Sequence, residues 1–241
     1  MGATKIEFKL RMVIMTVFIT LGFWAPWIEA LGIGRRISLL EWAAIELARS
    51  GLLPFAAAIP FVICVAALAA ALAVVLRVWG TAYLGAGVVQ HGEMKAGAVL
   101  ADGPYRLMRN PLYLGTWFMV VAMAFLMPVS GAMFATVLVG AFLMRLILGE
   151  EAFLSGQLGE PYQAYLKAVP RLVPRLRHGL EPAGAEPHWL HAVAAEINPI
   201  GVFLILAVLS WRYDNWLMVR AILVSFGVSL VVRAFMPRPE A

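Results

Sequence analysis

Cysteine is almost absent from this sequence. Cys64 is the only one among 241 residues, so an intrachain disulfide is excluded and no redox role is indicated. Charge is also scarce, because Asp, Glu, Lys and Arg make up 14% of the chain against 62% hydrophobic residues. With a mean hydropathy of +0.85, the composition excludes an ordinary soluble domain and indicates an integral membrane protein. The net charge of +5 is modest and does not indicate a nucleic-acid partner.

Two sequence signals are also missing. No small-residue cleavage site cleanly follows the first apolar run, which is longer than the core of a secretory signal, so we interpret this run as a retained span. No glycine fingerprint of a Rossmann dinucleotide site is apparent. Any nucleotide-like cofactor must therefore bind in another way.

Apolar runs dominate what remains. Since one membrane span needs about 20 residues, the chain has room for about six, and we predict an all-α, multi-pass helical bundle. The runs lie at residues 10–31, 53–76, 111–127, 129–148, 198–214 and 217–235. Residues 35–50 mix charged and apolar side chains at helical spacing, which predicts a helix lying in the membrane interface. Two longer polar segments are left over, residues 86–110 and 149–197.

The distribution of basic residues predicts the orientation. With six spans, most of the 19 lysines and arginines fall on the side of the N-terminus, as the positive-inside rule requires of a cytoplasmic side. Both polar segments then face the cytoplasm and can form one site together. We expect a bacterial inner (plasma) membrane protein with both termini and the site on the cytoplasmic side.

The most polar span boundary is the stretch 103–113, Gly-Pro-Tyr-Arg-Leu-Met-Arg-Asn-Pro-Leu-Tyr. Asn110 and Pro111 are typical of a helix start, with Asn as the N-cap and Pro at the first helical position. Arg106 and Arg109, taken alone, could simply contact lipid phosphate. Similarly, Arg77 and Trp79 after the second span are typical of an interfacial anchor.

Two carboxylates, Glu150 and Glu151, directly follow the predicted fourth span. The C-terminus of a helix favours cations, so these carboxylates should be compensated by other groups. Arg145 and the arginines of the first polar segment are the candidates.

Together these groups would suit one class of ligand. Guanidinium groups, adjacent carboxylates, aromatic rings and backbone donors at a helix mouth could bind a zwitterion with a carboxylate, an amine, ribose hydroxyls and a positive centre. S-adenosylmethionine fits this description. Methyl transfer from its sulfonium depends mainly on holding the acceptor in line and excluding water, so positioning supplies most of the rate.

The motifs resemble those of the isoprenylcysteine carboxyl methyltransferase family and the related phospholipid N-methyltransferases. Five blocks carry the resemblance: Arg77-x-Trp79 with Leu84-Gly85, Gly103-Pro104-Tyr105-Arg106-x-x-Arg109-Asn110-Pro111-x-Tyr113-x-Gly115, Glu150-Glu151, Gly159-Glu160-x-Tyr162-x-x-Tyr165 and Val169-Pro170-Arg171-x-x-Pro174. They define a methyltransferase-like core at residues 70–177. Residues 1–69 form N-terminal spans with the interfacial helix, and residues 178–241 form a linker with two C-terminal spans, all in one membrane domain.

The resemblance implies a small helical membrane bundle that holds S-adenosylmethionine between the two cytoplasmic segments. Carried over by position, it implies a cofactor pocket formed by Gln90, His91, Val99, Leu100, Tyr105, Asn110, Pro111, Tyr113, Glu150 and Glu151, with Arg109 also lining it. Arg109 and Arg175 would act near the acceptor and orient a carboxylate or phosphate. The family often has His at the position of Asn110, which cannot titrate near neutrality, so an acid or base role at this position is in doubt.

The sequence thus predicts a methyltransferase acting on a lipophilic acceptor that enters from the bilayer, with membrane lipids as its surroundings. A phospholipid amine, a prenylated or other hydrophobic carboxylate, and a thiol all remain open as acceptors. Two alternatives also remain: an NADPH-dependent membrane reductase of the steroid 5α-reductase type, and a non-catalytic membrane scaffold. His188 and His191 are spaced for metal ligation, but no Cys, Asp or third His joins them and Glu186 is the only close carboxylate, so we predict no metal site.

Overall fold

The computed structural model of the protein is all-α and describes residues 2–25, 27, 37–84, 101–175 and 184–235. No β-strand forms among these residues, which contain only an isolated bridge between Ser38 and Pro128. The elements are α1 (Lys5–Lys9), α2 (Arg11–Trp24), α4 (Leu39–Arg49), α5 (Phe55–Leu84), the 3-10 turn η1 (Gly103–Arg106), α7 (Pro111–Ala124), α8 (Val129–Leu158), α9 (Glu160–Ala168), α10 (Trp189–Ala195), α11 (Ile197–Leu204), the π-helical turn η2 (Ile205–Leu209), the 3-10 turn η3 (Ser210–Arg212) and α12 (Asn215–Phe235).

The expected all-α membrane fold is confirmed, but the expected number of six spans is confirmed only in part. Within the described residues, α5, α8 and α12 are long and apolar enough to cross a membrane, and the bent pair from α10 to η3 adds a fourth span if it is counted as one. The apolar helices α2 and α7 have 14 residues each. They are shorter than the roughly 20 residues that a straight span needs.

Helix α8 is longer than the sequence indicated. We predicted that the fourth span ends at residue 148, but α8 continues to Leu158 and stops at Gly159, whose φ of 60° favours glycine. Glutamate is a good helix former, so Glu150 and Glu151 do not end the helix. The two carboxylates therefore lie well inside α8, and the prediction that they stand at a helix C-terminus was wrong.

The outer boundaries of other helices also differ from the predicted ranges. Helix α2 ends at Trp24 instead of continuing to residue 31, because Ala25 adopts a left-handed conformation just before a proline in the sequence. Helix α5 extends to Leu84 instead of ending at residue 76. The helix predicted within residues 35–50 is confirmed as α4, which begins after a capping box formed by Ser38 and Glu41, and its position in the membrane interface stays a prediction.

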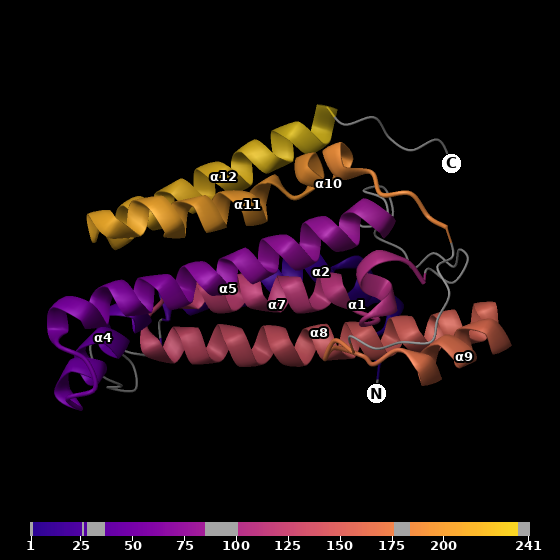
Figure 1. Cartoon of the computed structure of the whole chain (residues 1–241), viewed down its shortest axis with the longest axis horizontal. Coiled ribbons are helices and arrows are strands. Elements are labelled where there is room, and N and C mark those ends of the chain that lie inside the picture. The colour runs from indigo at the N-terminus through magenta and orange to yellow at the C-terminus, as the bar shows by residue number, and fades with distance from the viewer. Residues whose placement is uncertain (1, 26, 28–36, 85–100, 176–183, 236–241) are drawn as a thin grey trace.

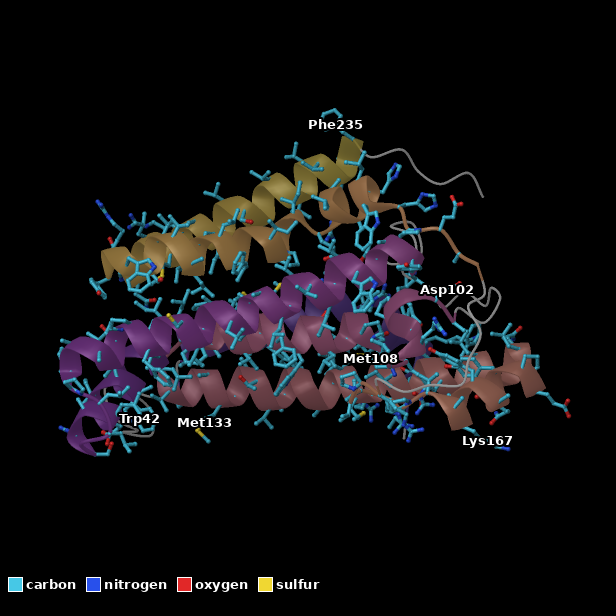
Figure 2. All side chains as sticks on the ribbon, viewed as in Figure 1. Trp42, Asp102, Met108, Met133, Lys167 and Phe235 are labelled. Atoms are coloured by element: carbon cyan, nitrogen blue, oxygen red, sulfur yellow. The ribbon has the colours of Figure 1, made fainter. Side chains whose placement is uncertain are left out.

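The shorter helix α7 lies alongside the long helices α5 and α8, and α4 sits at the opposite end of the molecule from α1 and α9 (Figure 1). Figure 2 shows Asp102, Met108 and Lys167 toward the same end, with Trp42 of α4 at the other. One end therefore carries η1, the start of α7, the end of α8, and α9. The described parts of the two polar segments, residues 101–110 and 149–175, do meet at one end of the fold.

Helices α2 and α8 approach each other at a pair of glycines. A Cβ atom on Gly131 would lie 1.9 Å from the carbonyl oxygen of Gly22 and 3.2 Å from the Cβ of Ala25. A side chain cannot be accommodated at such a distance. Small residues allow two helix backbones to come this close, and this is how membrane helices commonly pack.

The C-terminal helices form a separate layer on α5 (Figure 1). Helix α10 makes an angle of 67° with the following segment, which runs from α11 to η3. Helix α12 then returns along this segment. The bend places Glu196 inside the protein, where it forms an ion pair of 2.6 Å with Nε of Arg77. The prediction that Arg77 is an interfacial anchor was therefore wrong, because its partner is a carboxylate 119 residues away in the sequence.

Candidate active site

The turn η1 is held against the end of α5. Gly103 has a φ of 52°, and a Cβ there would lie 2.4 Å from the ring of Tyr83, so both conformation and space require glycine. The buried Tyr105 donates its hydroxyl hydrogen to the carbonyl of Gly80 at 3.3 Å. Tyr165 of α9 donates to the carbonyl of Tyr105 at 2.8 Å. These bonds join α5, η1 and α9 into one frame.

The tyrosines of this frame stay neutral. Burial is the main cause that raises the pKa of Tyr105 and of Tyr165 well above the usual value, and it raises the pKa of Tyr162 to about 12. All three hydroxyls therefore remain protonated across the physiological range. Tyr105 and Tyr165 donate hydrogen bonds, Tyr162 packs against Tyr165, and none of the three carries a charge.

The first carboxylate, Glu150, is bound from α7. Tyr113 lies in the first turn of α7 and donates its hydroxyl to Oε2 of Glu150 at 2.7 Å. The positive charge of Arg11 on α2 also acts on Glu150. The structure thus brings together two residues, Tyr113 and Glu150, that the sequence placed in one cofactor pocket.

The second carboxylate, Glu151, is held by two guanidinium groups and is only 7% exposed. Nη1 of Arg109 lies 3.4 Å from Oε1, and Arg171 donates from Nη2 at 2.7 Å and from Nε at 3.1 Å. The expectation that an arginine of the first polar segment compensates the carboxylates is confirmed for Glu151, by Arg109. The prediction that Arg145 also compensates them was wrong, because Nη2 of Arg145 pairs with Oε1 of Glu7 at 2.9 Å.

Arg171 was not predicted as a site residue from the sequence, although it lies in the last of the five motif blocks. Its ion pair with Glu151 raises the pKa of Arg171. The signal that could have identified it is its place in Val169-Pro170-Arg171, the block of the second polar segment that carries a cation. Carboxylates on a helix and a cation about 20 residues further along suit such a pair when the chain reverses direction between them.

The segment after α9 lies along the η1–α7 connection. The backbone amide of Arg109 donates to the carbonyl of Pro170 at 2.9 Å, and the amide of Arg175 donates to the carbonyl of Leu107 at 3.0 Å. These bonds place the backbone of Arg175 beside the connection, with its side chain exposed. The role of Arg175 in orienting the acceptor stays a prediction.

Asn110 and Pro111 begin α7 as expected, with Pro at the first turn. The Asn110 side chain, however, makes no capping hydrogen bond to the helix backbone. Its Nδ2 instead donates to Oε1 of Glu151 at 3.4 Å and to the carbonyl of Arg171 at 3.2 Å. The predicted capping interaction was wrong: the side chain is oriented by the two bonds that its Nδ2 donates, and its Oδ1 accepts no N–H from the start of α7. Asn110 thus connects the two polar segments.

Four expected cofactor residues, Gln90, His91, Val99 and Leu100, lie outside the described residues. Their place in a pocket stays a prediction.

The residues present fit S-adenosylmethionine. Nε of Arg109 is buried and has no hydrogen-bond partner among the described residues, so it can donate to an anionic group. Glu150 offers a carboxylate for an amine or for ribose hydroxyls, next to neutral aromatic rings. Donors, acceptors and ring faces therefore match the groups that this cofactor carries.

An apolar groove of about 640 Å³ begins where this polar cluster ends. It runs between α5, α7 and α8 and reaches the segment after α9, and its lining includes Leu76, Leu114, Trp117, Met144 and Val173. Tyr113 belongs to both regions, because it lines the groove and its hydroxyl binds Glu150. A hydrophobic chain in the groove would place a polar end next to the carboxylates.

Comparisons with curated proteins and with solved structures return no match. The family model described as PEMT, phospholipid methyltransferase, matches residues 61–160. This segment contains Arg77, Tyr105, Arg109 and both site carboxylates, whereas Arg171, Arg175 and the C-terminal helices lie beyond it. Residues 61–160 are thus similar to the phospholipid methyltransferases, and this confirms the resemblance drawn from the sequence motifs.

Proposed function

We propose that this protein is an integral membrane methyltransferase that uses S-adenosylmethionine and methylates a lipophilic acceptor entering from the bilayer. The observation that carries the proposal is the junction at Tyr113, where an apolar groove meets the polar cluster around Glu150 and Glu151. The match to phospholipid methyltransferases supports a lipid acceptor and favours this function over a reductase. The bias of basic residues supports a cytoplasmic site, beside the soluble pool of cofactor.

The side chains divide the work between binding and orientation. Glu150, oriented by Tyr113, binds the amine or ribose end of the cofactor. Arg109, oriented by Glu151, donates from Nε to a carboxylate or phosphate and, with Arg175, orients the acceptor. When bound, S-adenosylmethionine supplies an electrophilic methyl group on its sulfonium. The apolar groove keeps water away from the acceptor end, so positioning and desolvation supply most of the rate.

Methyl-labelled S-adenosylmethionine tests this function. Membranes containing the intact protein and matched membranes with Glu150→Gln are incubated with the labelled cofactor, and lipid, protein and small-molecule fractions are separated. We expect label in the lipid fraction only with the intact protein. The glutamine keeps an acceptor for Tyr113 but loses the charge that an amine requires. Equal labelling by both proteins would refute the role of Glu150.

Binding by the purified protein separates the alternatives. A methyltransferase is stabilised thermally by S-adenosylmethionine, because ligands that bind the folded state raise its melting temperature. Stabilisation by NADPH in its place would support a reductase. Stabilisation by neither cofactor, with no label in any fraction, would support a scaffold.

Filling the groove should impair use of the lipid acceptor. Met144 lines the groove on α8, and Met144→Trp should raise the apparent KM for a lipid acceptor about tenfold, because added bulk in an apolar pocket costs about 1–3 kcal/mol. Binding of S-adenosylmethionine should not change. Val137→Trp is the matched control, since Val137 lies two turns earlier on α8, is 65% exposed and does not line the groove. An equal effect of both substitutions would contradict the assignment of the groove.

A further inference from the structure

A buried ionic cluster joins the C-terminal helices to α5. Glu196 is completely buried and accepts hydrogen bonds from Nε of Arg77 at 2.6 Å, from Nη2 of Arg77 at 2.9 Å and from the Thr81 hydroxyl at 2.7 Å. Nη1 of Arg77 donates to Thr116 of α7 at 2.5 Å. Burial of two charges in an apolar protein has a large desolvation cost, and an apolar pair would give comparable stability. Intramembrane ionisable residues usually have a functional role.

The same C-terminal segment makes two more contacts at this end of the molecule. We name residues 185–196 the strap. The amide of Ala185 donates to Oδ2 of Asp102 at 2.8 Å, and the amide of His188 donates to the carbonyl of Ala82 at 2.8 Å. Together with Glu196, these bonds connect the strap to the end of α5 and to the N-cap residue of η1. Asp102 is 4% exposed, so its carboxylate bonds inside the protein.

The parts that the strap connects are the parts that carry the candidate site. Tyr105 in η1 binds the carbonyl of Gly80 in α5, one residue from Thr81. The chain then continues through Arg109 and Asn110, which directly precede α7. The side chains of both residues contact Glu151 of α8. A shift of η1 relative to α5 would therefore move Arg109 relative to its carboxylate. None of the strap belongs to the segment that matches the family model.

We propose that Glu196 is a positioning residue: through Arg77 and Thr81 it holds the strap on α5, and the strap sets the position of η1 and thereby the affinity for the cofactor. The C-terminal helices then serve the active site of this protein and do not merely enlarge its membrane domain. The statement about affinity rests on the proposed function, whereas the positioning of η1 does not.

Hydrogen exchange and cofactor binding test this inference on the full-length protein in lipid nanodiscs. In Glu196→Ala, we expect the amides of residues 102–108 to exchange about tenfold faster and the Kd for S-adenosylmethionine to rise about tenfold, which is a usual size for coupling between sites. The maximal rate of methyl transfer at saturating cofactor should change much less than the KM for cofactor. A purely structural role would lower the melting temperature without selective exchange in η1.

Two further variants provide an independent test of the strap contact and a control. Asp102→Asn weakens the bond to Ala185 without changing size, and it should give the same changes to a smaller extent even if Glu196→Ala does not fold. Glu46→Ala is the matched control, because it removes an exposed carboxylate that pairs with Arg49 at the opposite end of the molecule. It should change neither exchange in η1 nor cofactor affinity.

The two measurements distinguish the possible failures. Unchanged exchange at residues 102–108 in folded Glu196→Ala and Asp102→Asn would overturn the inference. Faster exchange with no binding of S-adenosylmethionine by the unmodified protein would support positioning of η1 by the strap, and it would refute the proposed cofactor.

Discussion

Replacing Arg109 with alanine is expected to lower methyl transfer by about 100- to 1000-fold while the protein still folds and inserts into the membrane. Truncating a buried, hydrogen-bonded charge costs about 2–5 kcal/mol, and each 1.36 kcal/mol is tenfold in rate. The backbone amide of Arg109 keeps its bond to Pro170 in the variant, and Glu151 keeps its pair with Arg171. The loss should therefore appear in methyl transfer from labelled cofactor and not in the amount of protein in the membrane.

Arg171→Ala is the comparison variant that distinguishes neutralisation of Glu151 from a direct contact of Arg109 with a bound group. Arg171 makes the closer and more extensive contact with Glu151, but its side chain is 40% exposed, against 11% for Arg109. If Arg109 only neutralised Glu151, Arg171→Ala would be the more harmful variant. If the spare Nε of Arg109 acts on a bound group, Arg109→Ala should be at least tenfold more harmful. A smaller loss in Arg109→Ala than in Arg171→Ala would remove Arg109 from the proposed machinery.

Gly131→Val is expected to destabilise the protein by about 3 kcal/mol, because overpacking of a tight contact costs about 1–3 kcal/mol and here the obstacle is backbone. The new Cβ would have to occupy a position 1.9 Å from the carbonyl oxygen of Gly22, so α2 and α8 must separate. Thermal unfolding in detergent, followed by tryptophan fluorescence, should show a clearly lower midpoint. Activity should fall with the folded fraction.

Gly156→Val is the matched control on the same helix. Gly156 lies in α8 and nothing stands within 4 Å of the position that its Cβ would take. Helix propensity alone changes by less than about 1 kcal/mol in such a replacement. A similar midpoint for the two variants would show that α2 and α8 do not pack through Gly131.

The features that sequence predicted best are those that depend on neighbours along the chain. The boundary between the predicted runs 111–127 and 129–148 falls at Pro128, and α8 does begin at Val129. Pro111 does open α7. Both predictions rest on the fixed φ of proline and its missing amide, which are properties of the residue itself. The sequence also predicted that an arginine of the first polar segment compensates the carboxylates, but it did not single out the pair of Arg109 with Glu151.

The features that sequence did not predict depend on partners far along the chain. Arg77 pairs with a residue 119 positions away, and Arg145 pairs with one 138 positions away. Seen alone, an arginine at the end of an apolar run suits contact with lipid equally well. The end of α8 was missed for a related reason: polarity at Glu150 marks a change of environment, whereas helix termination depends on Gly159. Hydropathy therefore predicted where the apolar runs end but not where the helices end.

The 30 residues of α8 form one uninterrupted rod of about 45 Å, longer than the roughly 30 Å of hydrocarbon in a bilayer. Glu150 and Glu151 belong to this same helix. Their distance from the bilayer centre is therefore set by how α8 sits in the membrane. A thicker or thinner membrane would shift the depth of lipid headgroups relative to these carboxylates, unless the rod tilts. We therefore expect the acyl-chain length of the host bilayer to change how far the proposed site stands from the lipid headgroups.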